Sequence, residues 1–270
     1  MICNNCPHGC DINEPFHGIC KAKGIANDKI RSLNYGQVTS IALDPIEKKP
    51  LKRFMPESMI LSIGSWGCNM TCPWCQNDSI SRGSASYREY SPEDVIRIAI
   101  DQKVNGNIGI AYTYNEALVA SDFVIDTAKL AKKAGLNNVL VTNGMANSEI
   151  FDDVTSYMDA MNIDLKTIDT SKYRSIGGDY EAILRNIKSA AKKCHVELTT
   201  LIVPGFNDSA DEMKFEAELI AGISDEIPLH ISRFFPAGNM RHASPTSVEL
   251  IYELRDIAAK RLKHVYTGNC

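Results

Sequence analysis

From residue 59 onward, apolar segments of strand length alternate with segments of helical period, and this alternation constrains the fold more than any other feature. Strands are predicted at residues 59–64, 106–112, 137–142, 159–165, 195–203, 228–235 and 263–267. Repeated strand–helix units build a parallel sheet that is covered by helices. Six such units with a seventh strand favour an α/β fold, a partial (β/α)6-type TIM barrel, over an open doubly wound sheet.

Residues that begin and end helices support the predicted helices. Ser91 is a predicted N-cap, with Pro92 at the first helical position and Asp94 in the first turn. Gly135 is predicted to end a long helix. Further helices are predicted at residues 116–134, 179–193, 209–221 and 246–262.

The first 58 residues have a different character from the rest. They are rich in cysteine and turn residues, with short strands predicted at residues 30–34 and 37–43 and a basic connector at residues 46–54. We therefore predict two parts: a Cys-rich metal-binding N-terminal appendage with its connector, residues 1–58, and a core barrel, residues 59–270. The lysines and arginine of the connector are predicted to be solvated surface: Lys48, Lys49, Lys52 and Arg53.

Charge and hydropathy exclude several classes of partner. A net charge of -4 over 270 residues gives no global attraction to nucleic acid. The sequence contains no apolar run near the roughly 20 residues that a membrane helix needs, and it begins MICNNCPHGC, which lacks the pattern of a secretory signal. We expect a cytoplasmic protein without a nucleic-acid or membrane partner.

Nine cysteines are many for a chain in a reducing compartment, where clustered thiols are more often metal ligands than disulfides. Seven of them fall into two groups: Cys3, Cys6, Cys10 and Cys20, and then Cys68, Cys72 and Cys75. Outside these groups, Cys194 is predicted to be a small buried side chain. Cys270 is either a free thiol or a group that faces a substrate.

The second group has the spacing C-x3-C-x2-C and directly follows the first predicted barrel strand. Such a loop can hold three corners of a [4Fe–4S] cluster, which leaves one iron without a protein ligand. The open iron can bind S-adenosylmethionine (SAM) and pass an electron to its sulfonium. A zinc knuckle or a four-ligand cluster would need a nearby fourth donor, and the next cysteine is Cys194. The end of a barrel strand is also where barrel enzymes place their active sites.

The first group has the spacing C-x2-C-x3-C-x9-C, which supplies four thiolates. This set suits a structural zinc ion or a second, auxiliary iron–sulfur cluster, and the spacing does not distinguish them. A site without metal is the third alternative. His8 and His17 are further donors nearby, but four cysteines make them unnecessary.

From these motifs the chain resembles the radical SAM superfamily, in particular the branch of pyruvate formate-lyase activating enzymes. Within that branch it is most similar to the radical SAM proteins associated with AMMECR1 and Memo proteins. The segments that carry the resemblance are CPHGC, GIC, DPIEKKPL, LSIGSWGCNMTCPWCQN, AYTYNEA, VTNG, NIDLK, TLIVPGFND, HISRFFP and VYTGN, which run in order along essentially the whole chain.

The resemblance implies the residues that contact SAM. Tyr114-Asn115-Glu116 matches a Gly-Gly-Glu element that contacts the SAM amino group, Thr142-Asn143-Gly144 matches a TNG turn, and Asp164-Leu165-Lys166 matches a DLK element beside SAM. His230 matches a histidine that reaches SAM. The predicted cofactor-binding set is therefore Asn115, Glu116, Thr142, Asn143, Asp164, Lys166 and His230.

Each of these residues also has a structural interpretation. Glu116 suits a helix start, Gly144 a turn, Asp164 with Lys166 an ion pair, and His230 a buried hydrogen bond. Two positions depart from the family pattern. Val141 stands where activating enzymes have an acidic residue of a cation site, and Thr199 stands where relatives often have arginine.

The resemblance implies reductive cleavage of SAM to methionine and a 5'-deoxyadenosyl radical, which abstracts hydrogen from a target. The target it suggests is a glycine of a glycyl radical enzyme, and the electron donor is a protein such as flavodoxin or ferredoxin. The alternatives are radical modification of a small molecule or of another protein. A protein that only binds iron–sulfur or zinc is the alternative outside enzymes.

Overall fold

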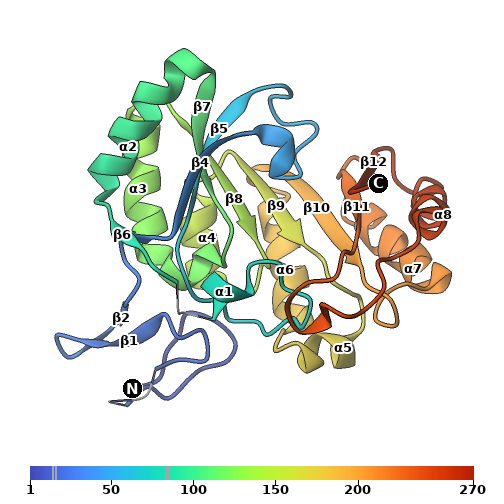
Figure 1. Ribbon diagram of the computed structural model, residues 1–270, viewed down its shortest axis with the longest axis horizontal. Helices are drawn as coiled ribbons and strands as arrows, with labels where there is room; N and C mark the ends of the chain where they lie inside the picture. Colours follow the sequence, from blue (N-terminus) through green and yellow to red (C-terminus); the bar gives the residue numbers. More distant parts are fainter. Residues whose placement is uncertain (14, 16, 83–84) are drawn as a thin grey trace.

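The computed structural model describes residues 1–13, 15, 17–82 and 85–270, and it shows a curved sheet with helices on its outer side (Figure 1). Eight strands form this sheet, in the order β12-β11-β10-β9-β8-β7-β5-β4. Their bounds are β4 Ser40–Pro45, β5 Met59–Gly64, β7 Asn107–Tyr112, β8 Asn137–Thr142, β9 Ala160–Asp164, β10 His195–Ile202, β11 Leu229–Arg233 and β12 Val265–Gly268.

From β5 to β12 all neighbouring strands are parallel, while β4 pairs antiparallel with β5. The described strands leave β4 and β12 at the two edges, so the barrel is incomplete. Strands buried on both faces, such as β7 and β8, are rich in apolar residues because the core lies on one face and helices lie on the other. The predicted α/β partial barrel is confirmed.

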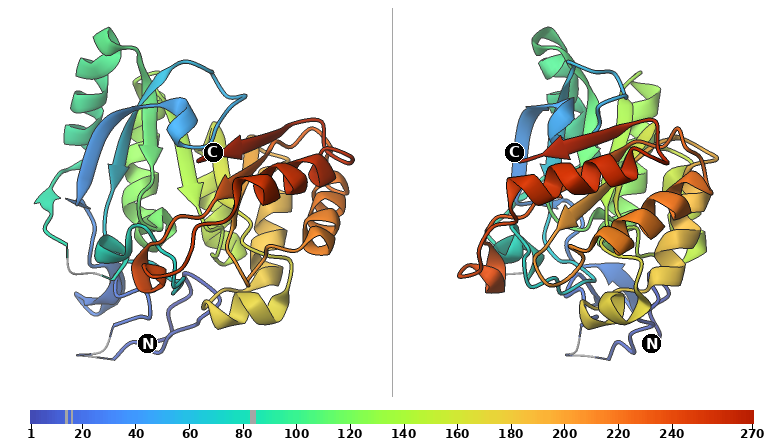
Figure 2. Two further views of the ribbon diagram at one scale, coloured as in Figure 1. Left: turned by 45° about the vertical axis from the view of Figure 1, so that its right-hand side comes forward. Right: turned by 90° about the vertical axis from the view of Figure 1, so that its right-hand side faces the viewer.

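The helices follow the strands around the outside of the sheet, and Figure 2 shows α8 beside β12 at the C-terminal edge. Their bounds are α1 Asp78–Ser81, α2 Pro92–Asp101, α3 Ser121–Lys133, α4 Ser148–Thr155, α5 Thr170–Ser175, α6 Tyr180–Ala190, α7 Ala210–Ala221 and α8 Val248–Ala258. Short 3-10 helices are η1 Ile46–Lys48, η2 Gln102–Asn105, η3 Ala117–Ala120 and η4 Gly238–Met240.

Two predicted helix signals are confirmed. The Ser91 side chain accepts from the backbone N–H of Asp94, and the Asp94 side chain accepts from the N–H of Ser91, which is a capping box. Gly135 follows α3 with φ of 65°, a left-handed conformation that glycine adopts without strain.

The predicted helix at residues 116–134 is wrong in its first turn. The structure has the 3-10 helix η3 there, and α3 begins only at Ser121. The Glu116 side chain caps η3 and is also bonded to the end of β8, so the first turn is drawn toward the sheet. Between Glu116 and α3, Ala120 has the non-helical angles φ −117° and ψ 44°.

The N-terminal segment adds two small sheets and one strand of the main sheet. β1 Lys23–Ala26 pairs with β2 Lys29–Ser32, and β3 Gln37–Val38 pairs with β6 Arg88–Glu89. The single strand predicted at residues 37–43 is wrong, because β3 and β4 have different partners. β4 pairs with β5 along its whole length. The division of the chain at residue 58 stays a prediction.

Within the described part of the chain, no helix is both long enough and apolar enough to cross a membrane.

Candidate active site

A cavity of about 370 Å³ opens at the carboxyl ends of the parallel strands. Most of the residues predicted to form the site line it: Cys68, Cys72, Cys75, Asn115, Glu116, Thr142, Asn143, Asp164 and Lys166. Parallel strands bring the loops that follow them to one edge of the sheet, so residues far apart in sequence meet there.

The three-cysteine loop follows β5 and folds over this cavity. The Cys68 thiol accepts hydrogen bonds from the backbone N–H of Met70 at 3.4 Å and from the Asn143 amide at 3.8 Å. Burial raises the pKa of the Cys68 and Cys72 thiols, and neighbouring negative charge adds to the rise at both. Buried thiolates at these positions would need a cationic partner.

The donor set fits a [4Fe–4S] cluster. Three thiols share one cavity, all three are free of disulfides, and the N–H of Met70 in the loop donates to the Cys68 sulfur. Among the described residues, no three His, Cys, Asp or Glu side chains lie close enough together to share a single metal ion. A cube does not require that arrangement, because its thiolates bind different iron atoms.

Glu116 joins the loop after β7 to the end of β8. Its side chain is 3% exposed and accepts from Thr142 Oγ1 at 2.6 Å, from the N–H of Asn143 at 2.7 Å and from the N–H of Leu118 at 3.0 Å. Burial raises the pKa of this carboxyl group, while these three hydrogen bonds lower it. The carboxylate therefore positions the Thr142-Asn143 turn, and it also lines the cavity.

Asp164 and Lys166 stand at the end of β9 and face the cavity together. Lys166 Nζ lies 2.8 Å from Asp164 Oδ2. Burial lowers the pKa of Lys166, but Asp164 and the Cys72 thiol outweigh burial and hold the pKa of the ammonium above its usual range. Asp164 and Lys166 form an ion pair, which is their structural interpretation. They also line the cavity, as predicted for residues that contact SAM.

A group that the sequence did not predict forms another wall of the cavity. Lys49 is 3% exposed, its Nζ lies 2.9 Å from Asp44 Oδ2, and it stands 4.7 Å from the centre of the Tyr114 ring. Tyr114 donates to Asp44 at 2.7 Å and has φ of 71°, which is a rare conformation for a residue with a side chain. The prediction of solvated surface is therefore wrong for Lys49, whose carboxylate partner lies five residues earlier.

His230 lies on the same strand as Ser232, but Ser232 lines the cavity and His230 is not among the described lining residues. Its Nε2 is 2.6 Å from Glu197 Oε2, and its ring stacks with Tyr266 at 5.4 Å between centroids. Two residues along a strand place His230 one layer deeper in the barrel. The His230 ring is thus hydrogen-bonded to Glu197, as expected for a structural histidine with a buried hydrogen bond.

The departures from the family pattern also lie at the cavity. Val141 and Thr199 both line it, and the Thr199 hydroxyl donates to Asn162 Oδ1 at 3.0 Å.

The first cysteine group forms two compact turns beside the three-cysteine loop. Cys3, Cys6 and Cys20 are buried, and Cys10 is half-buried. The Cys6 sulfur accepts from the N–H of His8, and the Cys20 sulfur accepts from the N–H groups of Ala22 and Lys23. Burial raises the pKa of the Cys6 thiol to about 11 and that of the Cys20 thiol above its usual range, and these N–H groups offset part of the rise. The metal of this group stays a prediction.

Cys194 and Cys270 are separate from both groups. Cys194 is half-buried, and burial raises its pKa to about 12, which keeps the thiol protonated. Cys194 was predicted to be a small buried side chain, and it packs, half-buried, against the main core. Cys270 is exposed.

Comparison with known families decides the class of this site. The model of the radical SAM superfamily matches residues 63–217, which are more than half of the chain. The chain belongs to this superfamily. The site of this radical SAM protein is therefore that of an enzyme, and the cofactors of the family are a [4Fe–4S] cluster and SAM.

Individual relatives agree with this assignment. The radical SAM chain is 37% identical to an uncharacterised protein of Methanocaldococcus jannaschii, over 99% of this chain and 80% of that one. It is 24% identical to the pyruvate formate-lyase-activating enzyme of Clostridium pasteurianum, over 72% of this chain and 81% of that enzyme. The fold matches a radical SAM methyltransferase from Sphaerobacter thermophilus with a TM-score of 0.61 at 15% identity, over 91% of this chain and 75% of that one.

Proposed function

We propose that Cys68, Cys72 and Cys75 hold the [4Fe–4S] cluster and that the protein abstracts hydrogen from a glycine of a partner glycyl radical enzyme. The observation that carries the proposal is the single cavity where these thiols meet Glu116, Asn143 and the Asp164–Lys166 pair. Similarity to an enzyme that activates pyruvate formate-lyase supports the choice of target.

When bound, the cluster and SAM supply methionine and a 5'-deoxyadenosyl radical after transfer of one electron from a donor such as flavodoxin or ferredoxin. The residues of this chain bind and orient the cluster and SAM. Asn143 donates to the Cys68 sulfur and is itself fixed through its N–H by Glu116. Asn115 and Thr142 complete the proposed SAM-binding wall.

The charges of the cavity suit the cofactor. SAM carries an ammonium, a sulfonium and a carboxylate, so it needs groups of both signs. Glu116 and Asp164 offer acceptors for the cations, and Lys166 offers a donor for the carboxylate. We do not include His230 in the proposed set, because its Nε2 is bonded to Glu197.

We also propose that Cys3, Cys6, Cys10 and Cys20 hold a second metal centre, either an auxiliary iron–sulfur cluster or a zinc ion. For zinc the four thiols would have to move together on binding, because in the described part of the chain no three of them are close enough to share one ion. The N–H groups that point at the Cys6 and Cys20 sulfurs support this. Metal analysis of a Cys68→Ser, Cys72→Ser, Cys75→Ser triple variant tests it. That protein should keep zinc or iron, and a metal-free protein would contradict the second centre.

Cleavage of SAM is tested by anaerobic reconstitution of the protein, reduction and addition of SAM. Methionine and 5'-deoxyadenosine are quantified together. We expect both products in equal amounts from the wild type and from Cys194→Ser, which is the matched control. Cys72→Ser should lose at least about a hundredfold in rate, because an incompletely held cluster cannot present its open iron. A reconstituted wild type that leaves SAM intact would contradict the proposed enzyme.

The target has its own test. Incubation of the reduced, SAM-loaded protein with a purified glycyl radical enzyme should give the doublet of a backbone radical in electron paramagnetic resonance (EPR). Cleavage of SAM without that doublet in any candidate partner would favour the alternative, a small molecule or another protein as the target.

A further inference from the structure

The N-terminal segment touches the residue that precedes Cys68. Gly67 has φ of 90°, and a Cβ atom at this position would lie 2.8 Å from the backbone oxygen of Cys20 and 2.9 Å from Cβ of Ala22. These contacts are too short for any side chain, so the backbones of the two segments are packed directly against each other. The turn that contains Cys20 therefore supports the start of the three-cysteine loop.

The same segment touches the residue that follows Cys68. His8 Nε2 donates to the backbone oxygen of Asn69 at 2.7 Å, and the Asn69 side chain is hydrogen-bonded to the Cys6 thiol. Asn69 is 1% exposed, and its amide also donates to the backbone oxygen of Met145 at 2.6 Å and accepts from Asn143 at 2.9 Å. A buried amide with all of these bonds has little freedom to move.

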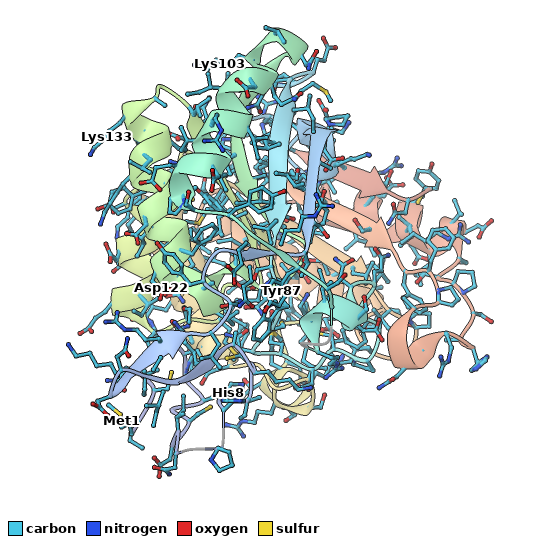
Figure 3. The ribbon with its side chains drawn as sticks, turned by 60° about the vertical axis from the view of Figure 1, so that its left-hand side comes forward. Met1, His8, Tyr87, Lys103, Asp122 and Lys133 are labelled. Carbon is cyan, nitrogen blue, oxygen red and sulfur yellow. The ribbon has the colours of Figure 1, made fainter. Side chains whose placement is uncertain are left out.

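The N-terminal segment is itself fixed to the barrel by other contacts. Asn5 donates to the backbone oxygen of Leu118 at 3.0 Å and accepts from the Ser121 hydroxyl at 3.2 Å, and its backbone oxygen accepts from the N–H of Asn147 at 3.1 Å. Figure 3 shows Met1 and His8 together at the end of the molecule opposite to Lys103 and Lys133. The segment is thus held between η3 and the loop after β8, next to the cavity.

We propose that the two N-terminal turns, residues 6–8 and 20–22, position the Cys68 ligand by holding Gly67 and Asn69 on either side of it. This inference rests on the proposed function, in which Cys68 binds the cluster. Its consequence is that the N-terminal cysteine group and the catalytic cluster are coupled: a change in one of the two N-terminal turns moves the Cys68 thiolate. Ligand orientation and hydrogen bonds to sulfur set the spectroscopic and redox properties of an iron–sulfur cluster.

The decisive comparison uses two histidines of the same segment. His8→Ala removes the donor to Asn69, and His17→Ala is the matched control, because His17 is exposed and no described hydrogen bond of this structure uses it. Each protein is reconstituted anaerobically, its iron is counted, and the reduced cluster is measured by EPR and by redox titration. At equal iron content, we expect altered EPR g values, a shifted midpoint potential and several-fold slower formation of 5'-deoxyadenosine for His8→Ala only.

Two further variants separate positioning from general damage. His8→Gln restores an N–H donor and should recover part of the wild-type signal. Gly67→Ala disturbs the loop from its other side and should shift the same signals, which keeps the inference testable if His8→Ala does not fold. If His8→Ala had the same EPR spectrum and midpoint potential as the wild type, this inference would be overturned and the proposed function would stand. A wild type that binds no cluster would overturn the proposed function and the inference together.

Discussion

Glu216 shows how burial determines the protonation of a carboxyl group. Glu216 on α7 is 1% exposed and is hydrogen-bonded to the Thr200 hydroxyl. That hydroxyl also lies 2.9 Å from the backbone oxygen of Leu165, which can only accept. The Thr200 hydroxyl donates to Glu216, and this bond by itself favours the charged carboxylate. Burial outweighs the Thr200 bond and, with a smaller contribution from the charge of Glu212, raises the pKa of Glu216 to about 8.

A pH-dependent stability follows for Glu216. Its pKa is higher in the folded protein, about 8, than the ordinary value of 4.5, so the stabilising effect is complete below pH 4.5 and is lost as the pH rises to 8. The slope is up to about 1.4 kcal/mol per pH unit. Glu216→Gln keeps an oxygen that accepts from the Thr200 hydroxyl and cannot ionise. Urea unfolding from pH 5 to 8 should show Glu216→Gln gaining free energy of unfolding relative to the wild type. A difference that does not change with pH would contradict the protonated assignment.

At this scale, all of the predicted cofactor-binding residues except His230 line the cavity, but the sequence did not predict their contacts. The spacing of Cys68, Cys72 and Cys75 and the resemblance were sufficient, because each motif follows a predicted strand. Asn69 and Tyr114 lie in matched segments, but neither was predicted to be a site residue. The partners of Asn69 come from residues 6–8 and 143–145, and Tyr114 adopts a positive φ that only its surroundings stabilise. Pairings across long sequence distances are set by the fold and not by local pattern.

Close packing between β7 and β8 depends on one glycine. A Cβ atom at Gly109 would lie 2.0 Å from the backbone oxygen of Asn137, its register partner on β8. Real Cβ atoms do not approach so closely, so either strand would have to move and the ladder would lose hydrogen bonds. The absence of a side chain at this position is what allows the two strands to pair in this register.

Gly109→Ala should therefore be severely destabilising. We expect a loss of at least about 3 kcal/mol in the free energy of unfolding, which is more than most single substitutions cause. Gly222→Ala is the control, because its φ of −66° is helical and its nearest atoms would lie at 3.3 and 3.4 Å. Urea denaturation compares them at one pH. Equal midpoints for the two variants would show that the strands adjust to the added methyl group.

The strands and the longer helices were predicted well, and the short helices were not. All seven predicted strands from residue 59 onward appear, because each is an apolar run with loop residues after it. α4 has 8 residues and α5 has 6, too few turns for a clear apolar period, and neither was predicted. Both are present because tertiary contacts bury residues such as Phe151 and Tyr173, which are 0% exposed.

At the scale of the whole molecule, Glu197 links the N-terminal third to the last strands. Its side chain is 0% exposed inside the barrel and accepts from the N–H groups of Lys52 and Arg53 at 2.9 and 2.7 Å. His195 and His230 lie 2.9 and 2.6 Å from the same carboxylate. The connector after η1 is thereby bonded to β10 and β11. The sequence indicated a basic connector but not its hydrogen bonds to Glu197, because the acceptor lies about 145 residues away.

Glu197 should stabilise the whole fold in a pH-dependent way opposite to that of Glu216. Burial alone would raise its pKa, but the two histidines and two N–H groups outweigh burial and lower the pKa to about 2 from 4.5. The stabilising effect is therefore complete above pH 4.5 and is lost as the pH falls toward 2. Glu197→Gln should lower the free energy of unfolding at pH 7 by on the order of 3 kcal/mol, and this deficit should shrink between pH 4.5 and 2.5. Urea unfolding across that range measures it, with Glu218→Gln as the control because Glu218 lies at the surface in an exposed pair with Arg261. A deficit that stays constant on acidification would mean that the shape of the side chain, and not its charge, holds the connector in the barrel.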